Sequence, residues 1–159
     1  MNNFHFASDF TKYFMTDLKK RSDCPISSSL DVWGDKWSLL IVRDLMFYKE
    51  RTYGDFLKSD EKIATNILAS RLQMLEQHEI ITKNTHPESK SKVLYKLTRK
   101  GIDLLPMMIE INLWADKHFT LPAERKAVLT EVMKDKESFL KDKTSVKDQQ
   151  PITFNSQPD

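Results

Sequence analysis

The chain has 159 residues, of which 40% are hydrophobic and 30% are charged, with a formal net charge of +2 at pH 7. This length suits one domain with a core and terminal extensions, and the single cysteine excludes an internal disulfide or a cysteine-rich zinc site. The apolar runs are too short to span a bilayer and the N-terminus lacks a signal-peptide core, so we expect a cytoplasmic protein with no membrane partner.

Positive charge gathers in one segment of this nearly neutral chain. Between Lys83 and Lys100 the only acidic residue is Glu88. The basic residues there are Lys83, Lys90, Lys92, Lys96, Arg99 and Lys100. Phosphate attraction depends on local potential, so this segment can present a basic surface to DNA although the net charge is small.

Residues 1–23 are expected to form an aromatic N-terminal extension with partial helical spacing, which includes Phe6, Phe10 and Phe14. Because exposed aromatic side chains favour association, this extension should pack against the chain's own core or a second subunit.

A helix should follow, and two starts are open. If Pro25 takes the first helical position, Cys24 is the N-cap and its sulfur lies near free backbone amides, which favours a thiolate. If the helix begins later, Ser28 is the N-cap and Asp31 its capping-box partner.

The next segments predict a helix-turn-helix. Residues 36–46 carry an apolar stripe typical of a core helix. Thr52, with Asp55 three residues later, marks the start of a short helix. The polar turn 59–62 then leads directly into the helical pattern of residues 63–81.

Residues 63–81 have two different faces. Ile67, Leu68, Leu72 and Leu75 recur at helical spacing, and the other side carries small polar residues and no charge: Thr65, Asn66, Ala69, Ser70, Gln73 and Gln77. Short amide and hydroxyl groups suit the floor of the DNA major groove. The competing interpretation is a helix whose second face is half buried.

A β-hairpin is predicted after this helix. Residues 80–84 and 93–97 form its strands, and residues 85–92 form a longer basic tip. A hairpin in this place favours a wing that contacts phosphates or the minor groove.

One long helix is expected from Thr98 to about His118, kinked at Pro106. It is apolar on two sides, so one side should pack on the core and the other on the same helix of a second subunit. Residues 119–143 should add a further helix, and residues 144–159 are polar enough to be disordered.

In this order the chain resembles the HxlR-type winged-helix transcriptional regulators of bacteria. The matching features span about residues 24–118: Cys24-Pro25, Gly34-Asp35-Lys36-Trp37, residues 63–81, residues 93–98, Lys100-Gly101, Pro106 and Trp114. The resemblance implies a mainly α fold with a small β-hairpin wing, a winged helix-turn-helix that dimerises through its terminal helices. It also implies a homodimer that binds double-stranded, pseudo-palindromic operator DNA.

The resemblance assigns roles to individual residues. Base contacts are expected from Thr65, Asn66, Ala69 and Ser70, although Asn66 is also a candidate local cap of its helix. DNA-backbone or wing contacts are expected from Arg71, Gln73, Lys90, Lys92 and Arg99, residues that equally suit a solvated surface. The dimer interface is expected to include Phe6, Phe10, Phe14, Met108, Ile111 and Trp114.

Cys24 stands at the family's Cys-Pro position, where similar proteins sense oxidants or electrophiles. The resemblance implies that thiolate modification or an intersubunit disulfide would shift the spacing of the two DNA-reading heads. The alternative is a buried, unreactive cysteine.

Enzyme motifs are missing from the sequence: the four histidines lack metal-ligand spacing, and there is no glycine-rich phosphate loop. We therefore expect neither catalysis nor a cofactor. The second hypothesis is a winged-helix module that binds protein without sequence-specific DNA binding, and the sequence names no small-molecule effector.

Overall fold

The computed structural model describes residues 22–139, and the chain divides into two compact units after Gly34. The first unit contributes helix α2 (Pro25–Trp33), and the second, from Asp35 onward, contributes all the other described elements. Phe6, Phe10 and Phe14, like the polar tail 144–159, lie outside the described residues.

Helix α2 begins at the earlier of the two predicted starts. Cys24 is its N-cap in an extended conformation, and Pro25 occupies the first turn. The amide of Ser28 donates to the Cys24 carbonyl oxygen at 3.0 Å, so Ser28 lies inside the first turn. The prediction of Ser28 as the N-cap is therefore wrong.

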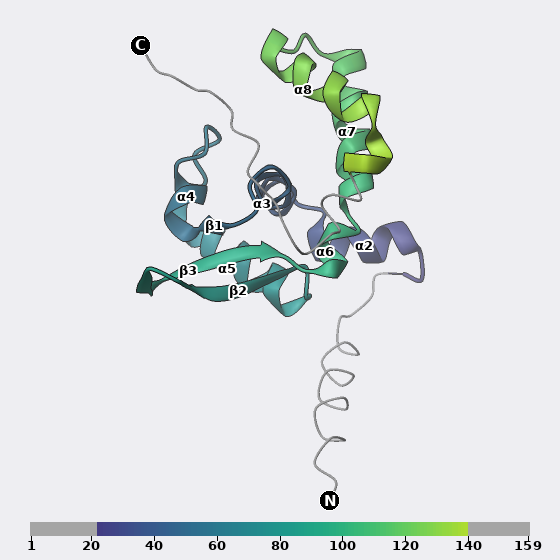
Figure 1. The fold of residues 1–159 in the computed structure, drawn as a ribbon. Coiled ribbons are helices and arrows are strands. Elements are labelled where there is room, and N and C mark those ends of the chain that lie inside the picture. The colour runs from purple at the N-terminus through teal and green to yellow at the C-terminus, as the bar shows by residue number, and fades with distance from the viewer. Residues whose placement is uncertain (1–21, 140–159) are drawn as a thin grey trace, which may run out of the picture. The chain divides into compact units, whose positions relative to one another are not determined.

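The second unit has the element order of a winged helix-turn-helix (Figure 1). Its elements are α3 (Lys36–Phe47), β1 (Arg51–Thr52), α4 (Tyr53–Leu57), α5 (Thr65–Gln77), β2 (Ile81–His86), β3 (Ser89–Leu97), α6 (Arg99–Ile102), α7 (Leu105–His118) and α8 (Ala123–Lys134). The three strands form an antiparallel sheet in the order β1-β3-β2. The predicted fold class is confirmed.

Side-chain caps mark the starts of α3 and α4. Asp35 accepts hydrogen bonds from the amides of Trp37 and Ser38 at the start of α3. Thr52 and Asp55 form the predicted capping box of α4. Burial alone would raise the pKa of Asp55, but the hydrogen bonds from Thr52 and the positive charges of Lys58 and Arg51 together lower that pKa.

The core of this unit lies where α3, α4, α5 and the sheet meet. Val42 of α3 and Leu68 of α5 are fully buried, and Phe56 of α4 is 2% exposed. The ring of Phe56 meets the ring of Tyr95 on β3 edge to face, with centroids 6.2 Å apart. Apolar burial of this kind holds the short helix α4 against the sheet.

Two predicted boundaries are corrected by the structure. Within residues 63–81 the helix occupies Thr65–Gln77: Ile63 is buried just before it, and Ile81 opens β2, one residue after the predicted start of that strand. The hairpin has no long basic tip: its strands extend to His86 and Ser89. Lys90 and Lys92 therefore lie on β3 itself.

The helix predicted from Thr98 to His118 is in fact two helices. Thr98 caps α6, which ends at Ile102, and a separate helix α7 begins at Leu105 with Pro106 in its first turn. Proline is tolerated there because the amide it lacks has no partner within the helix. The predicted kink at Pro106 is wrong.

Candidate nucleic-acid interface

Helix α5 turns an apolar face to the core and an uncharged polar face to solvent. Leu68, Leu72 and Leu75 are at most 3% exposed. The opposite face consists of exposed residues: Thr65, Asn66, Ala69, Ser70, Gln73 and Gln77. The competing interpretation, a helix whose second face is half buried, is therefore wrong. The short hydrogen-bond donors and acceptors of this exposed face form a surface that can approach base edges closely.

The start of α5 has no side-chain cap. Its N-cap is Ala64, so Asn66 is not the N-cap, and the Asn66 side chain is exposed in the first turn. The hydroxyl of Tyr53 on α4 donates to the carbonyl oxygen of Thr65 at 2.7 Å, which ties the first helix of the motif to the second. The positive end of the helix dipole thus lies beside Thr65 and Asn66.

Arg71 points from α5 to the start of α3. Its Nε donates to Oδ1 of Asp35 at 3.0 Å, and both side chains are about 30% exposed. Burial alone would raise the pKa of Asp35, but hydrogen bonds from Ser38 and the charge of Arg71 lower it. Arg71 therefore connects α5 to the start of α3, while Gln73 stays exposed beside the predicted base-reading residues.

Several residues of the predicted basic segment have partners within the chain. Lys83 pairs with Glu76 at 2.8 Å and Lys96 with Glu50 at 3.5 Å. Arg99 pairs with Asp103 at 3.5 Å, although both side chains remain largely exposed. The structure shows no ion pair for two exposed basic residues of this segment, Lys90 and Lys92, within the described residues 22–139.

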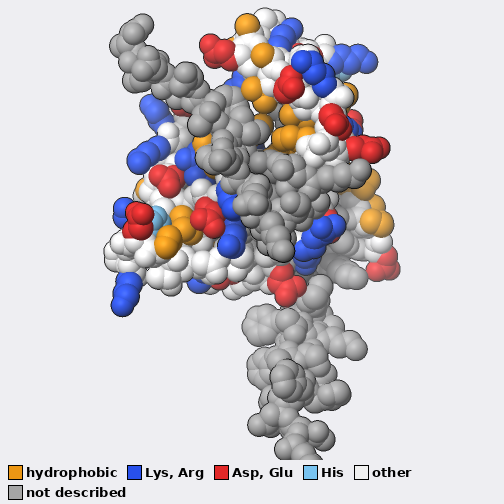
Figure 2. All heavy atoms as spheres, viewed as in Figure 1, with side chains coloured by type: hydrophobic (Ala, Val, Ile, Leu, Met, Phe, Trp, Pro, Cys, Tyr) orange, Lys and Arg blue, Asp and Glu red, His pale blue; other side chains and the backbone are white. Residues whose placement is uncertain are grey.

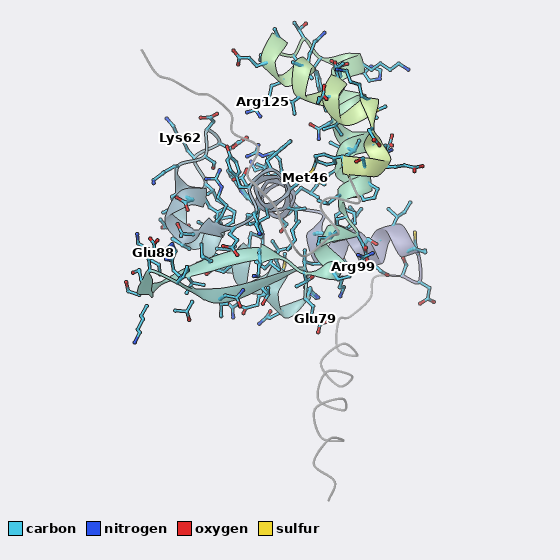
Figure 3. The ribbon with its side chains drawn as sticks, viewed as in Figure 1. Met46, Lys62, Glu79, Glu88, Arg99 and Arg125 are labelled. Atoms are coloured by element: carbon cyan, nitrogen blue, oxygen red, sulfur yellow. The ribbon has the colours of Figure 1, made fainter. Side chains whose placement is uncertain are left out.

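Figure 2 shows acidic and basic side chains intermingled on the face of the molecule that is in view. Figure 3 places Glu88 at the tip of the hairpin and Lys62 at the turn before α5. Acidic partners within the chain therefore offset part of the positive charge of Lys83, Lys96 and Arg99.

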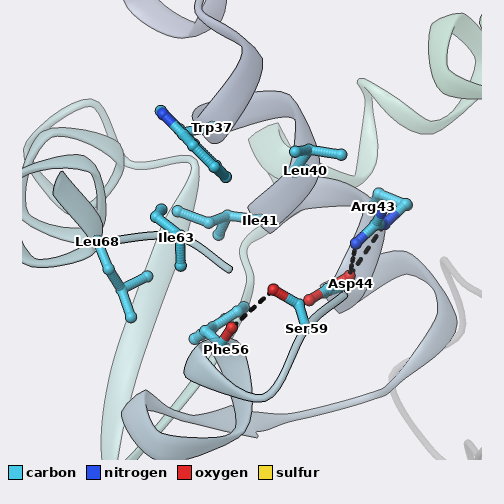
Figure 4. A pocket seen from close by; sticks show the side chains of 9 residues that line it. All are labelled: Trp37, Leu40, Ile41, Arg43, Asp44, Phe56, Ser59, Ile63 and Leu68. Carbon is cyan, nitrogen blue, oxygen red and sulfur yellow. Dashed lines mark hydrogen bonds and ion pairs between the residues drawn. The ribbon is translucent and has the colours of Figure 1, made fainter. Parts of the chain in front are cut away.

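Arg43 joins two carboxylates: Asp44, also on α3, and Glu61, in the turn before α5. Its Nε and Nη2 donate to Oδ1 of Asp44 at 3.0 and 2.7 Å, and its Nη1 and Nη2 donate to Glu61. Burial would lower the pKa of Arg43, but these two acids raise it, and Arg43 lowers the pKa of Glu61. Figure 4 shows Arg43 and Asp44 beside a cavity of about 10 Å³, lined also by Phe56, Ser59 and other side chains.

The predicted sensor and dimer residues differ in exposure. Cys24 is exposed, so the alternative of a buried cysteine is excluded. On α7, Ile111 is 44% and Trp114 58% exposed, whereas Met108 is 5% exposed and belongs to the core of its own chain. Ile111 and Trp114 line a shallow groove on α7 with Met107, Glu110, Leu113 and Lys117.

Asp35, Arg43 and Glu61 were missed as functional candidates. An Asp directly before an apolar helix is a local N-cap signal that could have found the capping role of Asp35. Arg43 and Glu61 are 18 positions apart, and Asp35 and Arg71 are 36 apart. Ion pairs at such separations leave no local pattern in a single sequence.

Residues 22–139 contain no group of three or more His, Cys, Asp or Glu side chains arranged to hold a metal ion. Within the same part of the chain, every helix is too short or too polar to cross a membrane.

Comparison with known proteins agrees with the helix-turn-helix fold of the structure. The model of the HxlR-like helix-turn-helix family matches residues 32–122. An uncharacterized transcriptional regulator of Synechocystis is 36% identical over 56% of this chain and 65% of its own length. The regulator YodB of Bacillus subtilis is 36% identical over 59% of this chain and 84% of its own length.

Solved structures show the same fold. PA1607, described as a putative transcription factor, has a TM-score of 0.56 at 41% identity and covers 65% of this chain and 71% of its own. Reduced YodB has a TM-score of 0.51 at 32% identity, over 61% of this chain and 95% of its own. Quinone-bound YodB has a TM-score of 0.50 at 32% identity, over 59% and 98%. The chain belongs to the HxlR-like helix-turn-helix family.

Proposed function

We propose that this chain is a transcriptional regulator that binds operator DNA as a homodimer and reads bases with α5 of each copy. The observation that carries the proposal is the exposed, uncharged face of α5. Its relatives are named as transcriptional regulators, which supports the same function over a protein-binding module. Such a regulator acts in the bacterial cytoplasm, where the DNA is.

Base reading falls to Thr65, Asn66, Ala69 and Ser70 near the start of α5. An Asn amide can bond to both N6 and N7 of adenine, and Ala or Thr methyl groups can contact the thymine methyl. Lys90 and Lys92 on β3 supply phosphate contacts from the wing. Arg99, just after the hairpin, adds a third positively charged side chain that can contact phosphate. These contacts position the protein and carry no sequence information.

Dimerisation covers the apolar groove on α7. Ile111 and Trp114 are too exposed for large apolar side chains of an isolated chain, and Glu110 and Lys117 give the groove a polar rim. A two-fold axis through this surface would present two copies of α5 to successive major grooves, which explains a pseudo-palindromic operator.

Cys24 is the proposed sensor of oxidants or electrophiles. Its thiol is exposed at the N-cap of α2, and its relative YodB has been solved in reduced and quinone-bound forms. A dimer supplies the second thiol that a disulfide needs. Treatment with diamide should change operator affinity of the wild type and leave Cys24→Ser unchanged, as measured by fluorescence anisotropy; an equal response of both proteins contradicts the sensor role.

Asn66→Ala should lower the preference for the operator over a scrambled duplex by about tenfold or more, because a bidentate base contact is lost. The measurement is a mobility shift with both duplexes at several salt concentrations. Lys90→Ala is the contrasting variant: it should weaken binding to every duplex alike and reduce the salt slope by about one. Equal affinity of the wild type for all duplexes would instead favour the protein-binding alternative.

A further inference from the structure

We propose that Arg43 and Glu61 form a latch that positions the reading helix, so that these two residues set sequence specificity without contacting DNA. The proposal rests on the function proposed above. Arg43 belongs to α3, which is part of the core, and Glu61 belongs to the turn directly before α5. The guanidinium group bridges Glu61 and Asp44 through four hydrogen bonds.

The turn needs such a contact because its backbone is strained. Lys62 has φ of 52°, a left-handed conformation that glycine adopts more easily, and the turn contains no glycine. Within the turn, the Lys62 amide donates to the Ser59 carbonyl oxygen at 3.1 Å and the Ser59 hydroxyl to that of Phe56 at 2.8 Å. Glu61 adds an attachment from this turn to α3.

Partial burial of the three charged side chains favours a well-ordered ion pair over a mobile, fully exposed one. The side chain of Asp44 is 8% exposed, that of Arg43 26% and that of Glu61 35%. Arg43 satisfies the buried Asp44 and at the same time presents its planar group to Glu61, a geometry that lysine cannot reproduce. Arg43 therefore fixes the position of Glu61 relative to α3 and the core.

Base recognition depends on the exact position of the reading side chains. Hydrogen-bonding constellations need their groups held within about 0.5 Å of the productive geometry. Thr65 and Asn66 come only a few residues after Glu61, so a looser turn would displace them first. Phosphate attraction is far less directional, and binding to random DNA should survive.

The test compares Glu61→Gln with Asp60→Asn, which removes the same charge from a neighbouring exposed residue of the same turn. Affinities for the operator selected by the wild type and for a scrambled duplex are measured by fluorescence anisotropy at one salt concentration. Glu61→Gln should lower the ratio of specific to non-specific affinity by about tenfold. Asp60→Asn should leave that ratio within about twofold of the wild type.

The double variant Arg43→Gln/Glu61→Gln adds a thermodynamic cycle. If the two residues act as one latch, its specificity ratio should be no lower than that of Arg43→Gln alone. Melting temperatures measured alongside separate a loss of stability from a loss of positioning. An unchanged ratio in Glu61→Gln, or an equal fall in Asp60→Asn, overturns the latch alone, whereas a wild type without sequence preference overturns the proposed function as well.

Discussion

Replacing Ile111 with aspartate is expected to convert the proposed dimer to a monomer and to weaken operator binding by about a hundredfold or more. Ile111 is 44% exposed in the groove on α7, so a charge there is tolerated in the isolated chain but not against a second apolar surface. Two linked reading heads bind by about two to four orders of magnitude more tightly than one, and the monomer loses that gain.

Sedimentation velocity gives the oligomeric state, and anisotropy with the operator gives the affinity. Ile111→Val is the matched control, because it keeps the groove apolar and should remain a dimer with near wild-type binding. A dimer that persists in Ile111→Asp would place the interface elsewhere on the chain.

Gly101→Ala should lower the free energy of unfolding by an amount on the order of 3 kcal/mol, at the upper end of overpacking costs. Gly101 is buried at the start of α6, and a Cβ there would clash with the carbonyl oxygen of Ile80. That oxygen cannot retreat easily, because it accepts a hydrogen bond from the Thr98 amide at 3.0 Å.

Urea unfolding at one fixed protein concentration measures this loss, since the stability of the proposed dimer would depend on concentration. Gly54→Ala is the control: a Cβ at Gly54 would meet only the Thr52 hydroxyl, 3.9 Å away. Alanine favours a helix more than glycine, so Gly54→Ala should be neutral or slightly stabilising. Similar losses for both glycines would show that the contact with Ile80 is not what matters at Gly101.

Local chemistry made much of this fold predictable from the sequence. The Thr52–Asp55 capping box marked the start of α4, and the helical period separated the exposed face of α5 from Leu68, Leu72 and Leu75. Both signals depend on residues within a few positions of one another, which is the range over which a single sequence is informative.

The incorrect or missed predictions concern features that residues close in sequence do not determine. A proline at a helix start and a proline in a helix interior look alike in sequence, and only the structure shows that α6 ends at Ile102 and that Pro106 lies in the first turn of α7. The hairpin lacks an Asn-Gly or Asp-Gly turn, so its length was set by pairing between β2 and β3. The ion pairs of Arg43 and Arg71 join distant positions and required the structure.

The most direct test of the account is selection of bound duplexes from a random pool by the full chain, followed by sequencing. Two copies of α5 related by a two-fold axis predict an inverted repeat whose half-sites are centred about 10 base pairs apart, or a multiple of that spacing. Enrichment of a single unrepeated site, or of no sequence at all, would contradict a dimer that reads DNA with the uncharged face of α5.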